Sequence, residues 1–148
     1  MTLTRTEHDA FGSVILPANR YWGAQTQRAL DVFGSQGERF SPELIHTFGQ
    51  QKLAAARANR RLGVLPPTLA EAIEQAAEKV ATGALDEHFP LTIWQTGSGT
   101  QTNMNANEVI ANIALARMGR CFGDYAALHP NDDVNRSQST NDVYPTAI

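Results

Sequence analysis

Residues 41–63 carry the strongest constraint on the fold, because a helix start signal, an apolar stripe and a stop signal follow one another. Ser41 can accept a hydrogen bond from the free N–H groups of a first helical turn. Pro42 suits the first helical position, since it has no N–H to satisfy. Gly63 is a good left-handed stop. The apolar residues between these signals recur at helical spacing: Leu44, Ile45, Phe48, Leu53, Ala56 and Leu62.

A second helix is predicted directly after the Pro66-Pro67 break. Thr68 and Glu71 have the spacing of a capping box, in which each side chain bonds to a free N–H near the other. Gly83 ends the pattern. The buried stripe of this helix is Leu69, Ile73, Ala76 and Val80.

The N-terminal residues follow a different pattern. Residues 1–20 show alternation and turn signals, and the segment FGSVILP at 11–17 predicts a short strand or extended arm that Pro17 ends. Residues 25–33 permit a short helix, ended by Gly34. The expected fold is therefore mainly α, with an extended or short-strand N-terminal arm.

Helical periodicity returns between Asn103 and Met118, where the apolar positions are Met104, Ile110, Ile113, Ala114 and Met118. Residues 120–138 are expected to form a loop, with a turn at 129–133. Residues 139–148 look like the opening of a last helix, for which Ser139 or Asn141 could be the cap.

Composition excludes several classes of protein. The 148 residues suit one domain, and no apolar run approaches the roughly 20 residues that a membrane helix needs. The net charge of −3 comes with scattered basic residues, which argues against nucleic-acid binding. A single cysteine excludes an internal disulfide, and the four histidines lack the spacing of a metal site. No secretory or organelle signal is recognised at the N-terminus, so a cytoplasmic location is expected.

Residues 97–100 (GSGT) combine glycines and hydroxyls just before a predicted helix. Gly97 and Gly99 let the backbone turn sharply, and Ser98 and Thr100 add donors beside the positive end of the helix. Such a start can bind a carboxylate without a formal cation. Without a ligand, the same residues would be an ordinary hydroxyl-rich cap. A phosphate-binding loop would need a lysine after the second glycine, and none is present.

Residues 139–141 (STN) place the same kind of side chains at a second helix start. One such start is more often a cap than a binding site. Two starts in one small domain favour a site for a small anionic or polar ligand.

The motifs TGSGTQTNMNANEVIAN at 96–112, HPNDDVN at 129–135 and QSTND at 138–142 resemble class II fumarase, the fumarate hydratase of the fumarase/aspartase superfamily. YWGAQTQR at 21–28 fits the same family. The resemblance implies a lyase that reversibly hydrates fumarate to L-malate in the tricarboxylic acid cycle. It implies a homotetramer when full length, and no cofactor. Residues 1–138 would be the N-terminal helical domain, and 139–148 would begin the central helical bundle.

The resemblance also implies roles for individual residues. Ser98, Thr100, Ser139, Thr140 and Asn141 would bind the substrate carboxylates, with Thr140 where many fumarases have serine. His129, Asn131 and Asp132 match a secondary dicarboxylate site, although Ala126-Ala127 stands where the family often has basic residues. No catalytic base or acid is expected within this chain, because the family carries both in later segments. The chain by itself is therefore expected to be inactive.

Two alternatives remain open from the sequence. One is an aspartate ammonia-lyase (aspartase) fragment of the same superfamily, and the other is a non-catalytic module that keeps only the fold. If covering segments are absent, apolar side chains near the C-terminus should be exposed, including Val143, Tyr144 and Ile148.

Overall fold

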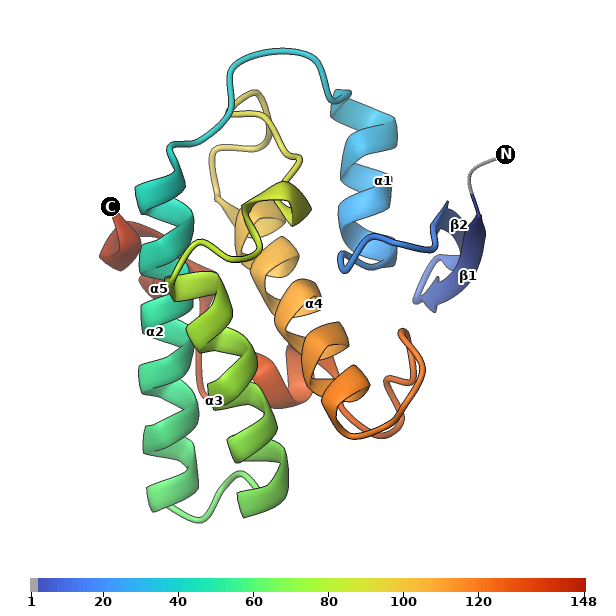
Figure 1. Cartoon of the computed structure of the whole chain (residues 1–148). Helices are drawn as coiled ribbons and strands as arrows, with labels where there is room; N and C mark the ends of the chain where they lie inside the picture. Colours follow the sequence, from blue (N-terminus) through green and yellow to red (C-terminus); the bar gives the residue numbers. More distant parts are fainter. Residues whose placement is uncertain (1–2) are drawn as a thin grey trace.

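The structure is a computed structural model that describes residues 3–148. Helices α2 (Pro42–Arg61) and α3 (Pro67–Ala81) form an antiparallel pair at one side of the molecule (Figure 1). The start of α2 is confirmed, because Ser41 Oγ accepts a hydrogen bond from Leu44 N at 3.4 Å. The capping box of α3 is wrong. Helix α3 begins at Pro67 without a side-chain cap, so Thr68 already lies inside the first turn.

The two helices approach most closely at Gly49. This glycine is buried, and a Cβ at its position would overlap the backbone of Val80 and Ala81. The predicted apolar stripes are largely confirmed, since Phe48 and Ile73 are fully buried. Leu62 is an exception at 75% exposure, because it lies beyond the last turn of α2.

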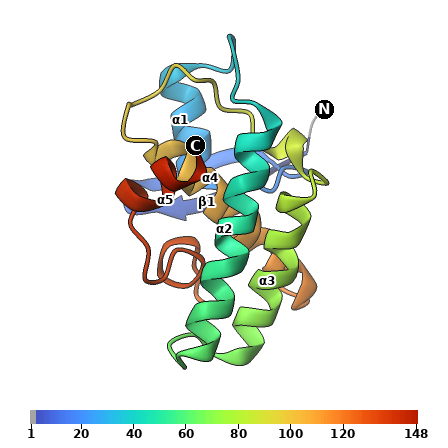
Figure 2. The ribbon, with the colours of Figure 1, turned by 90° about the vertical axis from the view of Figure 1, so that its left-hand side faces the viewer.

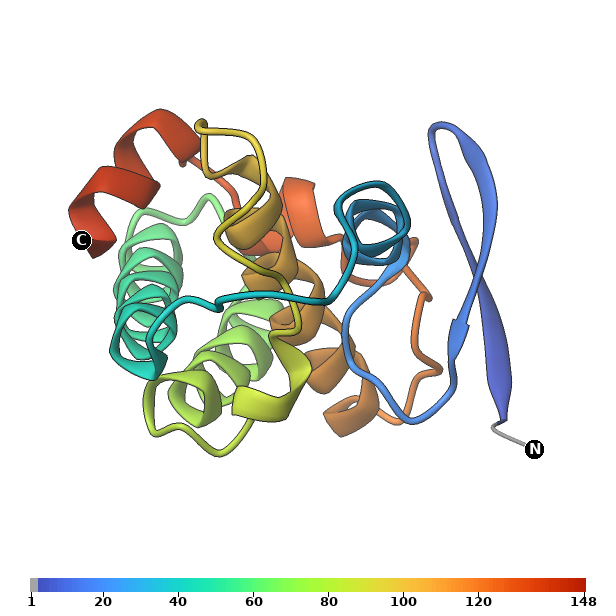
Figure 3. The ribbon, with the colours of Figure 1, turned by 90° about the horizontal axis from the view of Figure 1, so that it is seen from above.

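Helix α4 (Thr100–Arg117) passes through the centre of the molecule, between the α2/α3 pair and α1 (Figures 1 and 3). It begins three residues before the predicted start at Asn103. Every residue from 105 to 115 is buried, whereas Met118 is 38% exposed after the helix end. The buried polar side chains of α4 are Thr102, Asn103, Asn105, Asn107, Glu108 and Asn112.

Helix α1 (Ala24–Phe33) is capped by a residue from α4 rather than by its own N-cap, Gly23. The buried Glu108 carboxylate accepts hydrogen bonds from the backbone N–H of Gly23, Gln25 and Thr26, at 2.8 to 3.0 Å. It also accepts one from Thr26 Oγ1 at 2.6 Å. A negative group at a helix N-terminus stabilises the helix through its free N–H groups and its dipole. The GAQT part of the YWGAQTQR motif, residues 23–26, is therefore held by α4.

The N-terminal arm is an antiparallel hairpin of β1 (Thr4–Asp9) and β2 (Gly12–Pro17), at the opposite side from α2 and α3 (Figure 3). The strand prediction at 11–17 is confirmed. Glu7 attaches the hairpin to the loop after α4, because its buried carboxylate accepts a hydrogen bond from Tyr125 Oη at 2.8 Å. The same carboxylate pairs with Arg5 of β1 at 2.6 Å. Gly23 lies against this cluster so closely that a Cβ would overlap the Tyr125 hydroxyl.

The last third of the chain contains two short elements and the final helix. A single helical turn, η1 (Asp86–His88), precedes the GSGT segment, and a wide turn, η2 (Pro130–Val134), follows α4. Helix α5 (Thr140–Ala147) packs across α2, with Val143 only 2% exposed (Figure 2). The prediction that Val143 is exposed is wrong, because it joins the hydrophobic core. Ile148 is 84% exposed, as expected.

None of the helices within residues 3–148 combines the length and apolar character required to cross a lipid bilayer.

Candidate functional site

The two hydroxyl-rich segments, which lie far apart in the sequence, meet in the structure. Gly99 is buried with a φ of 71°, in the left-handed region that favours glycine. Its α-carbon lies so close to the Tyr144 ring that a Cβ would overlap the ring. The Tyr144 ring in turn packs 6.0 Å from the ring of Phe48 on α2. The second glycine of GSGT therefore serves both a turn and a contact between α4 and α5.

A hydrogen bond joins the same two segments below the surface. Asn103, in the first turn of α4, donates from Nδ2 to Thr140 Oγ1 at 2.8 Å. Its second Nδ2 proton goes to Asn135 Oδ1 at 3.2 Å. Thr140 is the first residue of α5. The start of α4 and the start of α5 are thus held side by side by a buried amide.

The GSGT segment presents a chain of hydroxyls at the surface. Ser98 Oγ lies 3.0 Å from Thr96 Oγ1 and 3.0 Å from Thr100 Oγ1. Thr96 also donates to Gln101 Oε1 at 2.6 Å. Ser98 and Thr100 are exposed, and α4 begins without a side-chain cap. The free N–H groups of its first turn therefore remain available beside these hydroxyls.

The start of α5 resembles the start of α4 in composition but not in capping. Ser139 is the N-cap of α5, and its Oγ accepts from Asn141 N at 3.3 Å. Of the two caps proposed from the sequence, Ser139 is the one observed. Ser139 and Asn141 are exposed, whereas Thr140 is half-buried because of its bond to Asn103. The five predicted carboxylate-binding residues therefore lie on two adjoining helix starts.

The residue that sequence reasoning missed is Lys52. This lysine of α2 is fully buried, and its Nζ donates to Asn135 Oδ1 at 2.8 Å and to Gln138 Oε1 at 3.0 Å. Burial lowers the pKa of Lys52 to about 7. The motif segments contain no lysine, but α2 brings one beneath them. A charged residue inside the apolar stripe between Phe48 and Ala56 was the only signal in the sequence.

His129, Asn131 and Asp132 lie together on η2. The Nδ1 atom of His129 accepts hydrogen bonds from Asn131 N and Asp132 N, both at 3.1 Å. The neutral imidazole therefore carries its proton on Nε2, which leaves a donor for a ligand. Asn131 Nδ2 donates to Asp132 Oδ1 at 3.2 Å, so the carboxylate also fixes the neighbouring amide.

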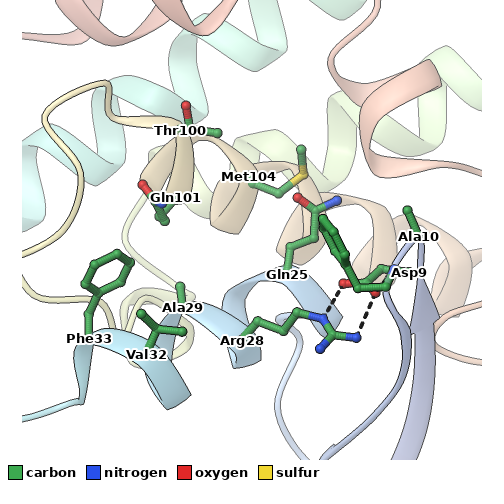
Figure 4. Close-up of a pocket in the computed structure, with 11 residues that line it drawn as sticks. Asp9, Ala10, Gln25, Arg28, Ala29, Val32, Phe33, Thr100, Gln101 and Met104 are labelled. Carbon is green, nitrogen blue, oxygen red and sulfur yellow. Dashed lines mark hydrogen bonds and ion pairs between the residues drawn. The ribbon is translucent and has the colours of Figure 1, made fainter.

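Two cavities lie under the tip of the hairpin. The first, of about 380 Å³, runs from Thr100, Gln101 and Met104 of α4 to α1, where Arg28 pairs with Asp9 at 2.7 Å (Figure 4). The second, of about 370 Å³, is lined by His129 and Asn131. Both volumes are in the range of small-molecule sites. The first cavity reaches Thr100 but not Ser139–Asn141. The candidate carboxylate site is therefore defined by the hydrogen bond that joins the two helix starts, and not by this cavity.

Within residues 3–148, no group of three His, Cys, Asp or Glu side chains is arranged to hold a metal ion. The polar groups at the two helix starts are hydroxyls, amides and backbone N–H groups. These are suited to binding an anion.

A family model described as lyase matches residues 12–148, and the chain belongs to this family. It is similar to fumarate hydratase class II of Brucella suis, with 56% identity over 148 residues, which is 100% of this chain and 32% of that relative. The chain spans about a third of the length of such relatives.

Solved structures agree with this assignment. The crystal structure of fumarate lyase:delta crystallin from Brucella melitensis in native form matches with a TM-score of 0.92 and 48% identity, over 98% of this chain and 34% of that one. Recombinant class II fumarase from Schistosoma mansoni matches with a TM-score of 0.89 and 39% identity, over 98% and 31% of the two chains. The predicted family and mainly α fold are confirmed.

Proposed function

We propose that this chain contributes the carboxylate-binding part of a fumarate hydratase, which reversibly adds water to fumarate to give L-malate. Ser98, Thr100, Ser139, Thr140 and Asn141 bind the substrate carboxylates. The observation that carries the proposal is the Asn103–Thr140 hydrogen bond, because it brings the two hydroxyl-rich helix starts together. Relatives that are 53 to 57% identical are named fumarate hydratase class II, which favours the hydratase over the aspartase alternative.

The chemistry of the reaction explains why donors of this kind are useful. Removal of a proton next to a carboxylate of malate builds negative charge on that carboxylate. Preorganised donors stabilise such charge, and this is often the largest catalytic contribution. The proposed base and acid lie outside this chain, in segments that the longer relatives contain. The 148-residue chain should therefore bind fumarate but not hydrate it.

The secondary site belongs to the same proposal. His129 offers its Nε2 proton, and Asn131 lines the same cavity, while Asp132 holds Asn131 in place. Homotetramer formation, a cytoplasmic location and a role in the tricarboxylic acid cycle are further proposals that rest on the family resemblance. The division into residues 1–138 and 139–148 remains a prediction, although α5 already packs on α2 and α4.

A titration of the ¹⁵N-labelled chain with fumarate or L-malate tests the proposal. We expect backbone amide shifts at 98–100 and 139–141, with a dissociation constant of about a millimolar, since only part of a site is present. Shifts that avoid both segments would contradict it. Absorbance of the fumarate double bond provides the second measurement. Turnover by this chain alone would show that the base and acid lie within residues 1–148.

A further inference from the structure

Lys52 has no ion-pair partner within residues 3–148, although it is fully buried. Its two acceptors are the neutral side-chain oxygens of Asn135 and Gln138, at 2.8 and 3.0 Å. A buried ammonium is costly, and an apolar residue of similar shape is often as stable or more stable. The hydrogen bonds of Lys52 thus do not by themselves account for a lysine at this position.

Lys52 donates through Nζ to one oxygen of each neighbouring amide, and these two hydrogen bonds fix the orientation of both amides. Asn135 must present its carbonyl oxygen to Lys52, and its Nδ2 donates to the backbone oxygen of Gln138 at 3.2 Å. Gln138 does the same, since its Nε2 donates to the backbone oxygens of Val134 and Arg136. Both amides therefore face Lys52 with their oxygens.

The fixed oxygen of Asn135 in turn orients Asn103. Because Asn135 Oδ1 is an acceptor, Asn103 presents Nδ2 to it at 3.2 Å, and the other Nδ2 proton reaches Thr140 Oγ1 at 2.8 Å. This orientation leaves Asn103 Oδ1 buried without a hydrogen-bond partner among the described residues. A buried unsatisfied oxygen costs free energy, so the orientation is imposed by its neighbours.

The consequence appears at the Thr140 hydroxyl. Its oxygen accepts from Asn103, and the hydroxyl proton has no acceptor among residues 3–148. The proton can then donate to a ligand carboxylate. If Asn103 turned over, its oxygen would take that proton instead, and the hydroxyl would be lost as a donor.

We propose that Lys52 is a positioning residue for the dicarboxylate site: through Asn135 and Asn103, it keeps the Thr140 hydroxyl oriented as a donor to the substrate carboxylate. This inference rests on the proposed function, because it assumes that Thr140 binds the ligand. The inference adds Lys52 of α2 to the site. Three successive hydrogen bonds connect Lys52 to Thr140, and Lys52 itself does not contact the ligand.

A double-mutant cycle with fumarate as the ligand tests this inference. Lys52→Met removes the donor while keeping the length of the side chain, and Thr140→Val removes the hydroxyl. A hydrogen bond to a charged group is worth roughly tenfold in affinity, so Thr140→Val should weaken binding about tenfold and Lys52→Met about fivefold. If Lys52 acts through Thr140, the double variant should bind no more weakly than Thr140→Val alone.

Two further variants control for general damage. Lys79→Met makes the same chemical change on the exposed face of α3 and should leave fumarate affinity unchanged. Thr140→Ser keeps the hydroxyl and should recover most of the affinity that Thr140→Val loses. If Lys52→Met does not fold, Asn135→Leu replaces it in the cycle, because it removes the oxygen that orients Asn103.

The outcomes separate the two proposals. Normal affinity of Lys52→Met, or a double variant whose losses multiply, would overturn the positioning role while leaving the dicarboxylate site intact. If fumarate shifts neither 98–100 nor 139–141 in the unmodified chain, the proposed function fails first, and the positioning role falls with it.

Discussion

Helices α3 and α4 lie against each other (Figure 1), but the residues that they bury differ in kind. The buried face of α3 is entirely apolar, with Ile73 and Val80 among four alanines. Helix α4 instead buries four asparagines, a threonine and a glutamate. Helix α3 therefore contributes mainly through apolar area removed from water, whereas α4 contributes through hydrogen bonds to other segments.

The hydrogen bonds of α4 hold loops as well as the starts of α1 and α5. Asn105 donates to the backbone oxygen of His88, in the turn η1, at 3.1 Å. Asn112 donates to the backbone oxygen of Tyr21 and accepts from Gly123 N, both at 2.8 Å. The segments that α4 holds include the two that carry the candidate site. Helix α3 thus provides packing, whereas α4 determines where the candidate site's segments lie.

The largest effect is expected at Glu108. Glu108→Ala leaves three backbone N–H groups and the Thr26 hydroxyl without their acceptor in a buried place. Breaking such a buried network should lower the free energy of unfolding by about 3–5 kcal/mol. The measurement is chemical denaturation. The matched control is Glu78→Ala on the exposed side of α3, which should cost less than about 0.5 kcal/mol. Equal effects would show that α4 does not depend on its polar residues.

The lowered pKa of Lys52 should be visible in the pH dependence of the unfolding free energy. Lys52 lies on α2 and is linked through Asn135 to the buried polar residues of α4. Burial lowers its pKa from 10.5 to about 7, so between these values the unfolded chain holds a proton that the folded chain has lost. The contribution of Lys52 to the free energy of unfolding therefore increases as the pH rises above 7.

The contribution of Lys52 is isolated by comparing the unmodified chain with Lys52→Met, because all other titrating groups occur in both proteins. The unfolding free energy of the unmodified chain, relative to the variant, should rise by roughly 2 kcal/mol between pH 7 and 9. The Lys79→Met variant provides the control for loss of a lysine on the surface. A difference between the unmodified chain and Lys52→Met that stays constant with pH would contradict the shift.

The same contrast explains what could be predicted from the sequence. The α2/α3 pair follows from local signals, because caps, stops and apolar spacing are read within one segment. The sequence predicts the start of α4 at Asn103, because β-branched residues, glycines and prolines are frequent up to position 102. Lys52 was missed because its acceptors, Asn135 and Gln138, lie more than 80 positions away. Val143 was expected at the surface because its burial against the core depends on tertiary packing.

The stability of the α2/α3 pair should be sensitive to steric change rather than to lost hydrogen bonds. Alanine is a better helix former than glycine by about 1 kcal/mol, but a Cβ at Gly49 would overlap the backbone of Ala81. Gly49→Ala should therefore lower the unfolding free energy by about 1–3 kcal/mol, because the helices must move apart. Gln50→Ala, on the exposed side of the same turn, should change it by only a few tenths. A stabilised Gly49→Ala variant would show that α2 and α3 can separate without cost.

The smallest effects concern two helix caps that have the same chemistry in the two regions. Ser41 caps α2 and Ser139 caps α5, each through its Oγ atom. Replacing either by alanine should cost about 0.5–1 kcal/mol of stability, since one N–H loses its acceptor. Only Ser139 belongs to the proposed dicarboxylate site, so Ser139→Ala should also weaken fumarate binding, by roughly threefold or more. Ser41→Ala therefore serves as a control with matched loss of stability. If both substitutions weaken binding equally, affinity follows helix stability, and Ser139 acts as a cap without contacting the ligand.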